Sequence, residues 1–187
     1  MKRKIVAFAM LPYAAFAAAT VHFDASEAAY ADGEASTVAA FPRLAAVPSH
    51  CTVEIEGADS VGEFEVWFCT DESASPASCD FVIGVDAGRL FARGRDLHTI
   101  EFCGDTLPEN AVSIVFRFKQ NFVGETIPVV AETNGTRNGF LSAQFAEAHP
   151  GRWCSMKIVS RDCASGVPAV SVSRSGTGTA IRLAALH

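Results

Sequence analysis

Six cysteines are the residues of this chain most suited to chemistry, and their spacing limits what that chemistry is. Eight residues separate Cys154 from Cys163 and nine separate Cys69 from Cys79, whereas zinc sites use close pairs such as C-x2-C. A redox C-x-x-C motif is absent as well. A framework of about three disulfides remains, with its pairing open because six cysteines allow about fifteen connectivities. The disulfide candidates are Cys51, Cys69, Cys79, Cys103, Cys154 and Cys163.

The histidines do not stand in a recognisable catalytic motif. A cysteine nucleophile needs an unpaired thiol and a histidine base, but His50 and Cys51 are neighbours in an extended segment, so their side chains point apart. His98 could join Asp96 or Asp105 and a serine in a triad, yet no G-x-S-x-G motif supports a nucleophile. The sequence therefore predicts no catalytic residue and a protein that is not an enzyme.

Three carboxylates bracket a serine-rich loop and are the candidates for a cation site. Asp71, Glu72 and Asp80 flank the segment SASPAS, but the calcium-loop pattern D-x-[DN]-x-[DN]-G is absent. A solvated loop explains these residues, so neither a metal ion nor another cofactor is predicted.

Two further segments are candidates for modification or binding. The sequon NGT at Asn134 fits the pattern for N-glycosylation, although Asn-Gly is also a favoured hairpin turn. The segment GRLFARGRD places Arg89, Arg93 and Arg95 close together. This basic patch could bind a sulfated glycan or an acidic partner, or it could be a solvated hairpin.

The first 31 residues have the layout of a secretory signal. A basic head at residues 2–4 precedes residues 5–21, which carry no charge, and small residues suited to a signal peptidase end at Ala31. An uncleaved membrane anchor is the alternative, because residues 5–23 are about as long as a membrane span. Either way, the body lies outside the cytoplasm, as an even number of cysteines also indicates. The predicted location is secreted or at the extracellular surface.

The charge of the chain limits its partners. A formal net charge of −6 without a basic block argues against nucleic acid and anionic membrane surfaces. Contact with a membrane is expected only through an uncleaved N-terminal segment, and the oligomeric state stays open.

The elements that must position these residues are strands. In EFEVWFC, residues 63–69, the Phe and Val side chains share one face, while the Glu side chains point to the other. The segments 111–119 (AVSIVFRFK) and 155–160 (SMKIVS) alternate in the same way. Only residues 141–149, LSAQFAEAH, offer a helical alternative. The sequence predicts an all-β fold, an antiparallel β-sandwich stapled by about three disulfides.

Composition divides the chain into four parts. Residues 1–31 are the signal peptide or anchor, and residues 32–50 are an Ala/Pro-rich linker. The disulfide-stapled β-sandwich covers residues 51–173, and residues 174–187 form a flexible tail of small residues. The length corresponds to about one ordinary domain with short extensions.

In cysteine order the chain resembles the six-cysteine surface-antigen (SAG-related) superfamily of coccidian parasites. The resemblance rests on the strand FEVWFC that ends at the second cysteine, and on a closing cysteine pair before the alternating segment AVSVS. The gap between the third and fourth cysteines is longer than in that family. The resemblance implies a β-sandwich displayed to host cells and antibodies, and the nested pairs Cys51–Cys163, Cys69–Cys154 and Cys79–Cys103.

These features predict a secreted or surface-exposed binding or adhesion module. Its partner would be a protein or a glycan outside the cytoplasm, recognised through loops on the sandwich. The alternative is a structural subunit of an extracytoplasmic or membrane-anchored assembly, and an enzyme without a recognisable motif is a third interpretation. As a surface antigen modified at Asn134, the protein would be a glycoprotein.

Overall fold

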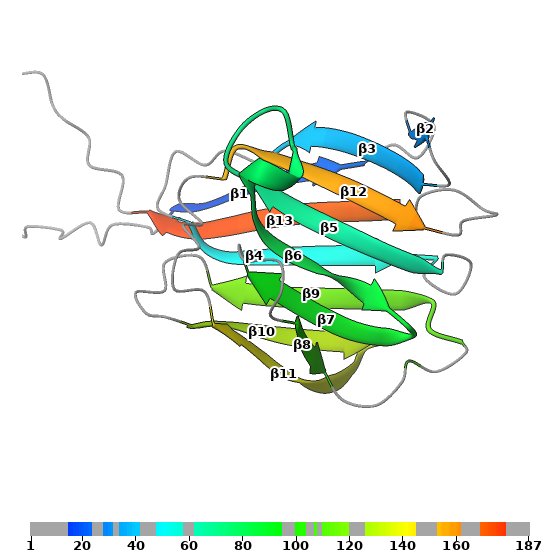
Figure 1. Ribbon diagram of the computed structural model, residues 1–187. Helices are drawn as coiled ribbons and strands as arrows, with labels where there is room; N and C mark the ends of the chain where they lie inside the picture. The colour runs from blue at the N-terminus through cyan, green and yellow to red at the C-terminus, as the bar shows by residue number, and fades with distance from the viewer. Residues whose placement is uncertain are drawn as a thin grey trace, which may run out of the picture.

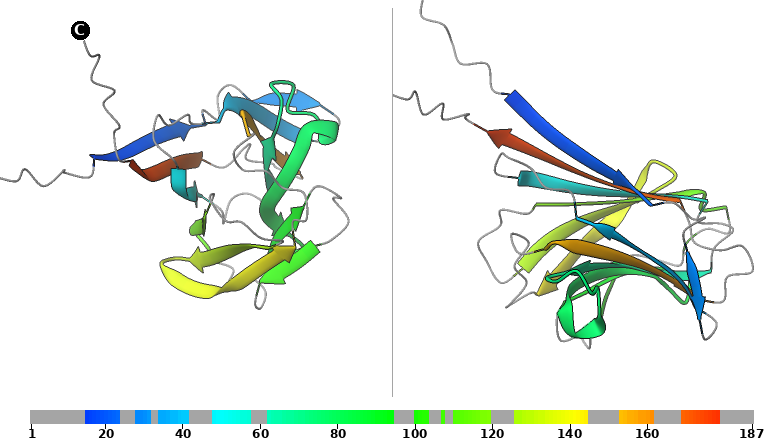
Figure 2. Two further views of the ribbon diagram at one scale, coloured as in Figure 1. Left: turned by 90° about the vertical axis from the view of Figure 1, so that its left-hand side faces the viewer. Right: turned by 90° about the horizontal axis from the view of Figure 1, so that it is seen from above.

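The protein is a sandwich of two antiparallel β-sheets, seen face-on in Figure 1 and from two other sides in Figure 2. The computed structural model describes residues 15–23, 28–31, 34–41, 48–57, 62–94, 100–103, 107, 110–119, 126–144, 153–161 and 169–178. The predicted all-β antiparallel sandwich is confirmed.

Two sheets and one short helical turn make up the described chain. Sheet A has six strands in the order β1 (Ala15–His22), β13 (Ala169–Gly178), β4 (Pro48–Glu56), β9 (Ser113–Lys119), β10 (Thr126–Thr133) and β11 (Thr136–Gln144). Sheet B has seven, in the order β2 (Ala29–Ala31), β3 (Glu34–Ala40), β12 (Ser155–Arg161), β5 (Glu63–Cys69), β6 (Cys79–Asp86), β7 (Arg89–Gly94) and β8 (Ile100–Cys103). A 3-10 helix, η3 (Pro76–Ser78), lies in the connection between β5 and β6.

Alternating side chains fill the space between the sheets, as the sequence predicts. Phe64, Val66 and Phe68 of β5 are buried in the core. Sheet A contributes every second residue of β4 and β9, namely Val53, Ile55, Ile114, Phe116 and Phe118. The alternation predicted over residues 111–119 fails at Val112, which precedes β9 and is 52% exposed.

Aromatic rings pack one end of this core. The ring centroid of Trp153 lies 4.7 Å from that of Phe68 and 5.6 Å from that of Phe81. Phe41 and Phe118 complete the cluster, in edge-on contact with Trp153. The indole Nε1 of Trp153 donates a hydrogen bond of 2.9 Å to Asp80, which satisfies its polar atom inside the core. The cluster ties both sheets together.

The sandwich extends beyond the limits predicted for it. Strand β3 lies inside the predicted linker 32–50, between β2 and β12, and Phe41 after it is buried. Strand β13 continues to Gly178, past the predicted boundary at residue 173. Small side chains explain the error, since Ala35 occupies an inward position of β3 and leaves no apolar alternation to recognise.

The N-terminal segment also contributes to both sheets. Within residues 1–31, β1 pairs with β13 and β2 pairs with β3. Processing of this segment stays a prediction. Among the residues that the structure describes, no helix is long and apolar enough to cross a membrane.

The helical alternative at residues 141–149 is wrong where the structure describes it. Residues 141–144 belong to β11, which pairs with β10 as far as Thr126 and Gln144. Residues 145–149 lie outside the described residues.

Candidate ligand-binding face

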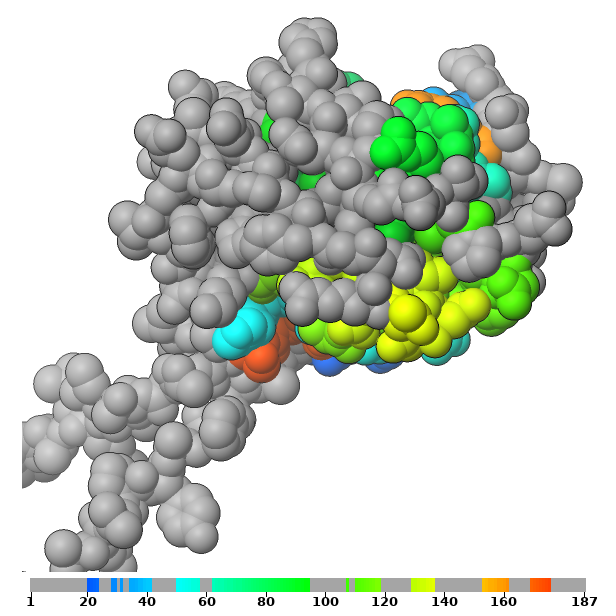
Figure 3. Space-filling model, turned by 90° about the horizontal axis from the view of Figure 1, so that it is seen from below, coloured from blue at the N-terminus to red at the C-terminus, as the bar shows by residue number. Residues whose placement is uncertain are grey.

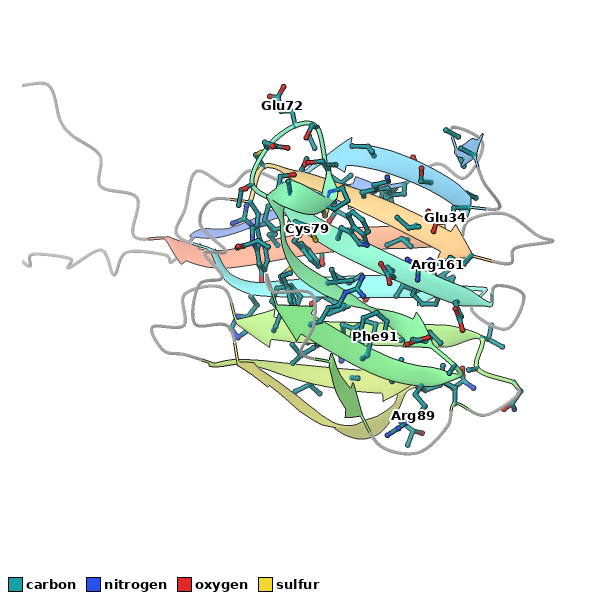
Figure 4. The ribbon with its side chains drawn as sticks, in the orientation of Figure 1. Glu34, Glu72, Cys79, Arg89, Phe91 and Arg161 are labelled. Carbon is teal, nitrogen blue, oxygen red and sulfur yellow. The ribbon has the colours of Figure 1, made fainter. Side chains whose placement is uncertain are left out.

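The side chains of sheet B that point away from the core form its outer face, which is turned toward the reader in Figures 1 and 4. In β5 the Phe and Val side chains fill the core, so Glu65 and Trp67 point outward. The register places Trp67 between Lys157 of β12 and Val82 of β6. Strand pairing therefore brings charged and aromatic side chains from distant parts of the chain onto one face.

A carboxylate at the centre of this face collects several donors. Oε2 of Glu65 accepts hydrogen bonds of 2.6 Å from Trp67 Nε1 and 2.7 Å from Arg93 Nη2. Nη1 of Arg161 lies 3.4 Å from the other oxygen, and Nε of Arg161 donates to Glu34 at 2.9 Å. We call these five residues the Glu65 network. Figure 4 shows Glu34 and Arg161 next to each other on adjacent strands.

Burial differs across the Glu65 network. The side chains of Glu65 and Arg93 are 6% and 16% exposed, whereas those of Arg161 and Glu34 are 43% and 46% exposed. The hydrogen bond to Glu34 raises the pKa of Arg161 above its ordinary value, and the charge of Glu65 adds to this effect. The network thus has a fixed, buried centre and an accessible, permanently charged end.

Cations cover two of the rings on this face. Nζ of Lys157 lies 5.4 Å from the ring centroid of Trp67, and the guanidinium carbon of Arg93 lies 5.5 Å from that of Phe91. Both distances fall within the range of cation–π attraction, about 6 Å. These contacts place the cationic groups of Arg93 and Lys157 over aromatic rings of the outer face.

One donor on this face has no acceptor among the residues that the structure describes. Nε of Arg93 is buried and makes no hydrogen bond to any residue that the structure describes. An unsatisfied buried donor costs about 1–3 kcal/mol, so an oxygen from water or from a ligand would stabilise this position.

A glycine leaves the middle of the face without a side chain. Gly84 of β6 lies between Glu65 and Phe91 in the strand register. A Cβ atom at Gly84 would lie 2.1 Å from the carbonyl oxygen of Phe64, so no other residue fits there without moving the backbone. A groove of about 330 Å³ lies next to β3 and is lined by residues 38–40 together with Glu72, Cys154 and Ser155.

The predicted arginine patch is divided by the structure. Arg89 and Arg93 both point to the outer face of sheet B, but Arg93 is paired with Glu65 while Arg89 lies near the β6–β7 turn. Arg95 lies outside the described residues. The structure adds Glu65 and Trp67 to the site, whereas the sequence pattern predicts them only as parts of a strand. The signal that could have identified them is an aromatic residue on the charged side of the alternation.

The cysteines with described side chains lie in three surroundings. Cys51 is buried in the core, where burial raises the pKa of its thiol to about 12. Cys69 and Cys79 lie opposite each other in β5 and β6, and Cys154 lines the groove. No disulfide joins Cys51, Cys69, Cys79 and Cys154 to one another, so the predicted framework stays a prediction.

One pair implied by the surface-antigen resemblance does not fit the strand register. Cys103 of β8 lies opposite Leu90, and Leu90 lies opposite Val85 of β6. Val85 is six residues from Cys79 along β6, which corresponds to about 20 Å, whereas disulfides join Cα atoms within about 7 Å. A Cys79–Cys103 bond is therefore excluded in this arrangement. The side chain of Cys103 and all of Cys163 lie outside the described residues.

The predicted turn at Asn134 is confirmed. Asn134 and Gly135 have positive φ angles of 48° and 76° and connect β10 to β11 at the surface, in a segment visible in Figure 3. The Asn134 side chain also braces a neighbouring loop. Its Oδ1 accepts from the backbone N–H groups of Val112 and Ser113, and its Nδ2 donates to the carbonyl of Asn110. Glycosylation at Nδ2 stays a prediction.

The carboxylates considered for calcium do not converge. Asp71 accepts from the backbone and hydroxyl of Ser73, and Asp80 accepts from Trp153 in the core. The described residues contain no group of three or more His, Cys, Asp or Glu side chains that could hold a metal ion. His98, which entered the hypothetical triad, lies outside the described residues.

The fold is shared with proteins of very different sequence. No family model and no curated protein sequence matches the chain. Among solved structures, exo-inulinase from Aspergillus awamori matches with a TM-score of 0.51 at 10% identity, over 85% of this chain and 29% of that one. The exoplasmic/lumenal domain of VIP36, in its Ca²⁺/Man3GlcNAc-bound form, matches with a TM-score of 0.51 at 4% identity, over 91% and 89% of the two chains. At these identities the similarity establishes the β-sandwich fold.

Proposed function

We propose that this protein is a glycan-binding module, and that the outer face of sheet B, around the Glu65 network, is the surface that binds the sugar. The observation that carries the proposal is the centre of that network. There a buried carboxylate fixes one indole and two guanidinium groups, and one guanidinium N–H lacks an acceptor among the described residues.

The chemistry of a sugar suits this arrangement. A sugar ring presents hydroxyl groups at its edge, which need donors and acceptors at fixed positions, and C–H groups on its faces, which pack on apolar surface. Arg161 supplies donors and Glu34 supplies acceptors, and both are half accessible. Lys157, whose Nζ lies over the Trp67 ring, offers the aliphatic part of its side chain for apolar contact. Prior fixing of these groups by Glu65 reduces the entropy lost on binding.

The shared fold supports the same proposal. VIP36, whose lumenal domain has this sandwich, was solved with a mannose-containing oligosaccharide. The proposal includes secretion and display outside the cytoplasm, which the basic-then-apolar N-terminal segment and the cysteine content favour. Adhesion through bound glycans would then be the role of this face.

Calorimetry with two soluble probes tests the proposal: a mannose oligosaccharide and a fructan oligosaccharide. Replacing Arg161 by glutamine removes the accessible charge of the Glu65 network, and the matched control is Arg117→Gln, which breaks an exposed ion pair with Glu132 on sheet A. We expect at least one probe to bind. Arg161→Gln should weaken its affinity about tenfold or more, because the variant loses a charged hydrogen bond, and the control should leave the affinity unchanged. Absence of binding to both probes, or equal effects of the two variants, would overturn the proposal.

A further inference from the structure

Cys69 and Cys79 are partners in the antiparallel pairing of β5 and β6, at the end of sheet B where the chain turns through residues 70–78. The Cα atoms of such partners are about 4.5–5.5 Å apart, which lies within the span of a disulfide, about 4.4–6.8 Å. A register shift between Phe68 and Cys69 accompanies this pair. Figure 4 shows Cys79 at this end of the face.

The two side chains share one small apolar cluster. Cys69 and Cys79 are 0% and 2% exposed, and they pack together with Trp67 and with Ala74 from the connecting segment. The two thiols interact directly, since Cys79 lowers the pKa of the Cys69 thiol. Backbone and side-chain bonds from Thr70 to the carbonyl of Ser78 close the segment above them.

We infer that Cys69 and Cys79 form a disulfide bond with each other under oxidising conditions, which cross-links β5 to β6 and closes the connection between them. The surface-antigen resemblance implies a different partner, Cys154, for Cys69. Cys154 is close in the backbone, because its N–H donates to the carbonyl of Cys69 at 2.9 Å. However, the side chain of Cys154 is partly exposed and lines the groove beside β3, whereas Cys69 and Cys79 are buried together.

Oxidised glutathione can serve as the oxidant. The Cys69 thiolate attacks one sulfur of oxidised glutathione, the S–S bond breaks, and one glutathione thiolate leaves. The Cys79 thiolate then attacks the sulfur of Cys69, forming the protein disulfide and releasing the second glutathione. The two protein thiols lose two protons and two electrons, and oxidised glutathione takes up both electrons. Cys69 is the first attacker because the interaction with Cys79 lowers the pKa of Cys69. Since both thiols are buried, the reagent meets them during folding or when residues 70–78 open.

Peptide mapping of the full chain identifies the bond. The protein is refolded with oxidised and reduced glutathione, its remaining thiols are alkylated after denaturation, and it is digested with trypsin and a glutamate-specific protease. Cleavage after Glu72 separates the two cysteines into peptides 66–72 and 73–89, and Cys154 falls in peptide 153–157. We expect peptide 66–72 to be linked to peptide 73–89, with neither Cys69 nor Cys79 alkylated in the oxidised protein and both alkylated in the reduced protein.

Two variants keep the result interpretable. Cys154→Ser is expected to retain the bond between peptides 66–72 and 73–89, whereas Cys79→Ser is expected to leave Cys69 alkylated. A link between peptides 66–72 and 153–157 would overturn the inference. Alkylation of both Cys69 and Cys79 in the oxidised protein would overturn it as well.

Discussion

Replacing Glu65 by glutamine perturbs the centre of the outer face of sheet B with little change of shape. The carboxylate accepts from Trp67 and Arg93 and lies near Arg161. The amide keeps one acceptor oxygen but carries no charge, and its NH₂ group replaces an acceptor with a donor. The variant therefore leaves two guanidinium groups without their shared counter-charge.

The magnitude follows from burial. The Glu65 side chain is 6% exposed and that of Arg93 is 16% exposed, so this pair is largely withdrawn from water. Breaking a buried ion pair by removing one partner costs about 3–5 kcal/mol. Arg93 keeps some access to solvent, and the contribution of the more exposed Arg161 is small. We therefore expect the free energy of unfolding to fall by about 2–3 kcal/mol.

Urea unfolding measures this change, and the chain offers a matched control. Glu132 pairs with Arg117 at 2.5 Å on sheet A, but these side chains are 25% and 45% exposed. Glu132→Gln should lower the free energy of unfolding by less than about 1 kcal/mol. If Glu65→Gln fell within about 0.5 kcal/mol of this control, the claim that burial makes the Glu65 network strong would be refuted.

Three further predictions concern the packing and the turns of the two sheets. Gly84→Ala should lower the free energy of unfolding in urea by about 2–3 kcal/mol, because its Cβ would meet the Phe64 carbonyl at 2.1 Å. Gly62→Ala, with 3.6 Å to its nearest neighbour, should change that energy little; equal effects would contradict the packing argument. Asn134→Ala should lower the free energy of unfolding by about 2 kcal/mol, because two accepted hydrogen bonds are lost and alanine disfavours the positive φ angle. Asn134→Gly should recover the part due to the backbone in the same unfolding assay. In reductant, burial raises the pKa of the Cys51 thiol from 9.0 to about 12, so the folded protein favours the neutral thiol. The resulting stabilisation of the folded state is present below pH 9 and is lost as the pH rises toward 12. The difference in unfolding free energy between the parent chain and Cys51→Val should therefore shrink by about 2 kcal/mol between pH 8.5 and 10.5, and a constant difference would contradict the burial of this thiol.

The sandwich was predictable where large side chains alternate. The sequence predicts strand β5 because Phe64, Val66 and Phe68 alternate and face the core, and it predicts β9 from the alternation of its phenylalanines. Strand β3 gives no such signal, since alanine and threonine occupy its inner face. Its position is decided by pairing with β12, a segment more than a hundred residues away.

The candidate site was much less predictable, because it is assembled across strands. Arg93 and Arg161 reach Glu65 from 28 and 96 residues away, so no local spacing reveals the network. Glu65 alone has the pattern of a solvent-facing residue on a half-buried strand. The same holds for Asn134. The dipeptide Asn-Gly predicts its turn, but the hydrogen bonds of its side chain to the backbone of residues 110–113 depend on the tertiary fold.

The two tryptophans of the chain offer the most direct test of a sugar bound on the outer face of sheet B. The indole N–H of Trp67 donates to Glu65 on that face, whereas the indole N–H of Trp153 donates to Asp80 inside the aromatic core. Each gives its own signal in a ¹H–¹⁵N correlation spectrum, and Trp67→Phe assigns them. On titration with the oligosaccharide that binds most tightly, we predict that the Trp67 indole signal shifts with increasing ligand and saturates, while the Trp153 signal stays in place. Saturable binding that leaves the Trp67 signal unmoved would contradict the assignment of this face.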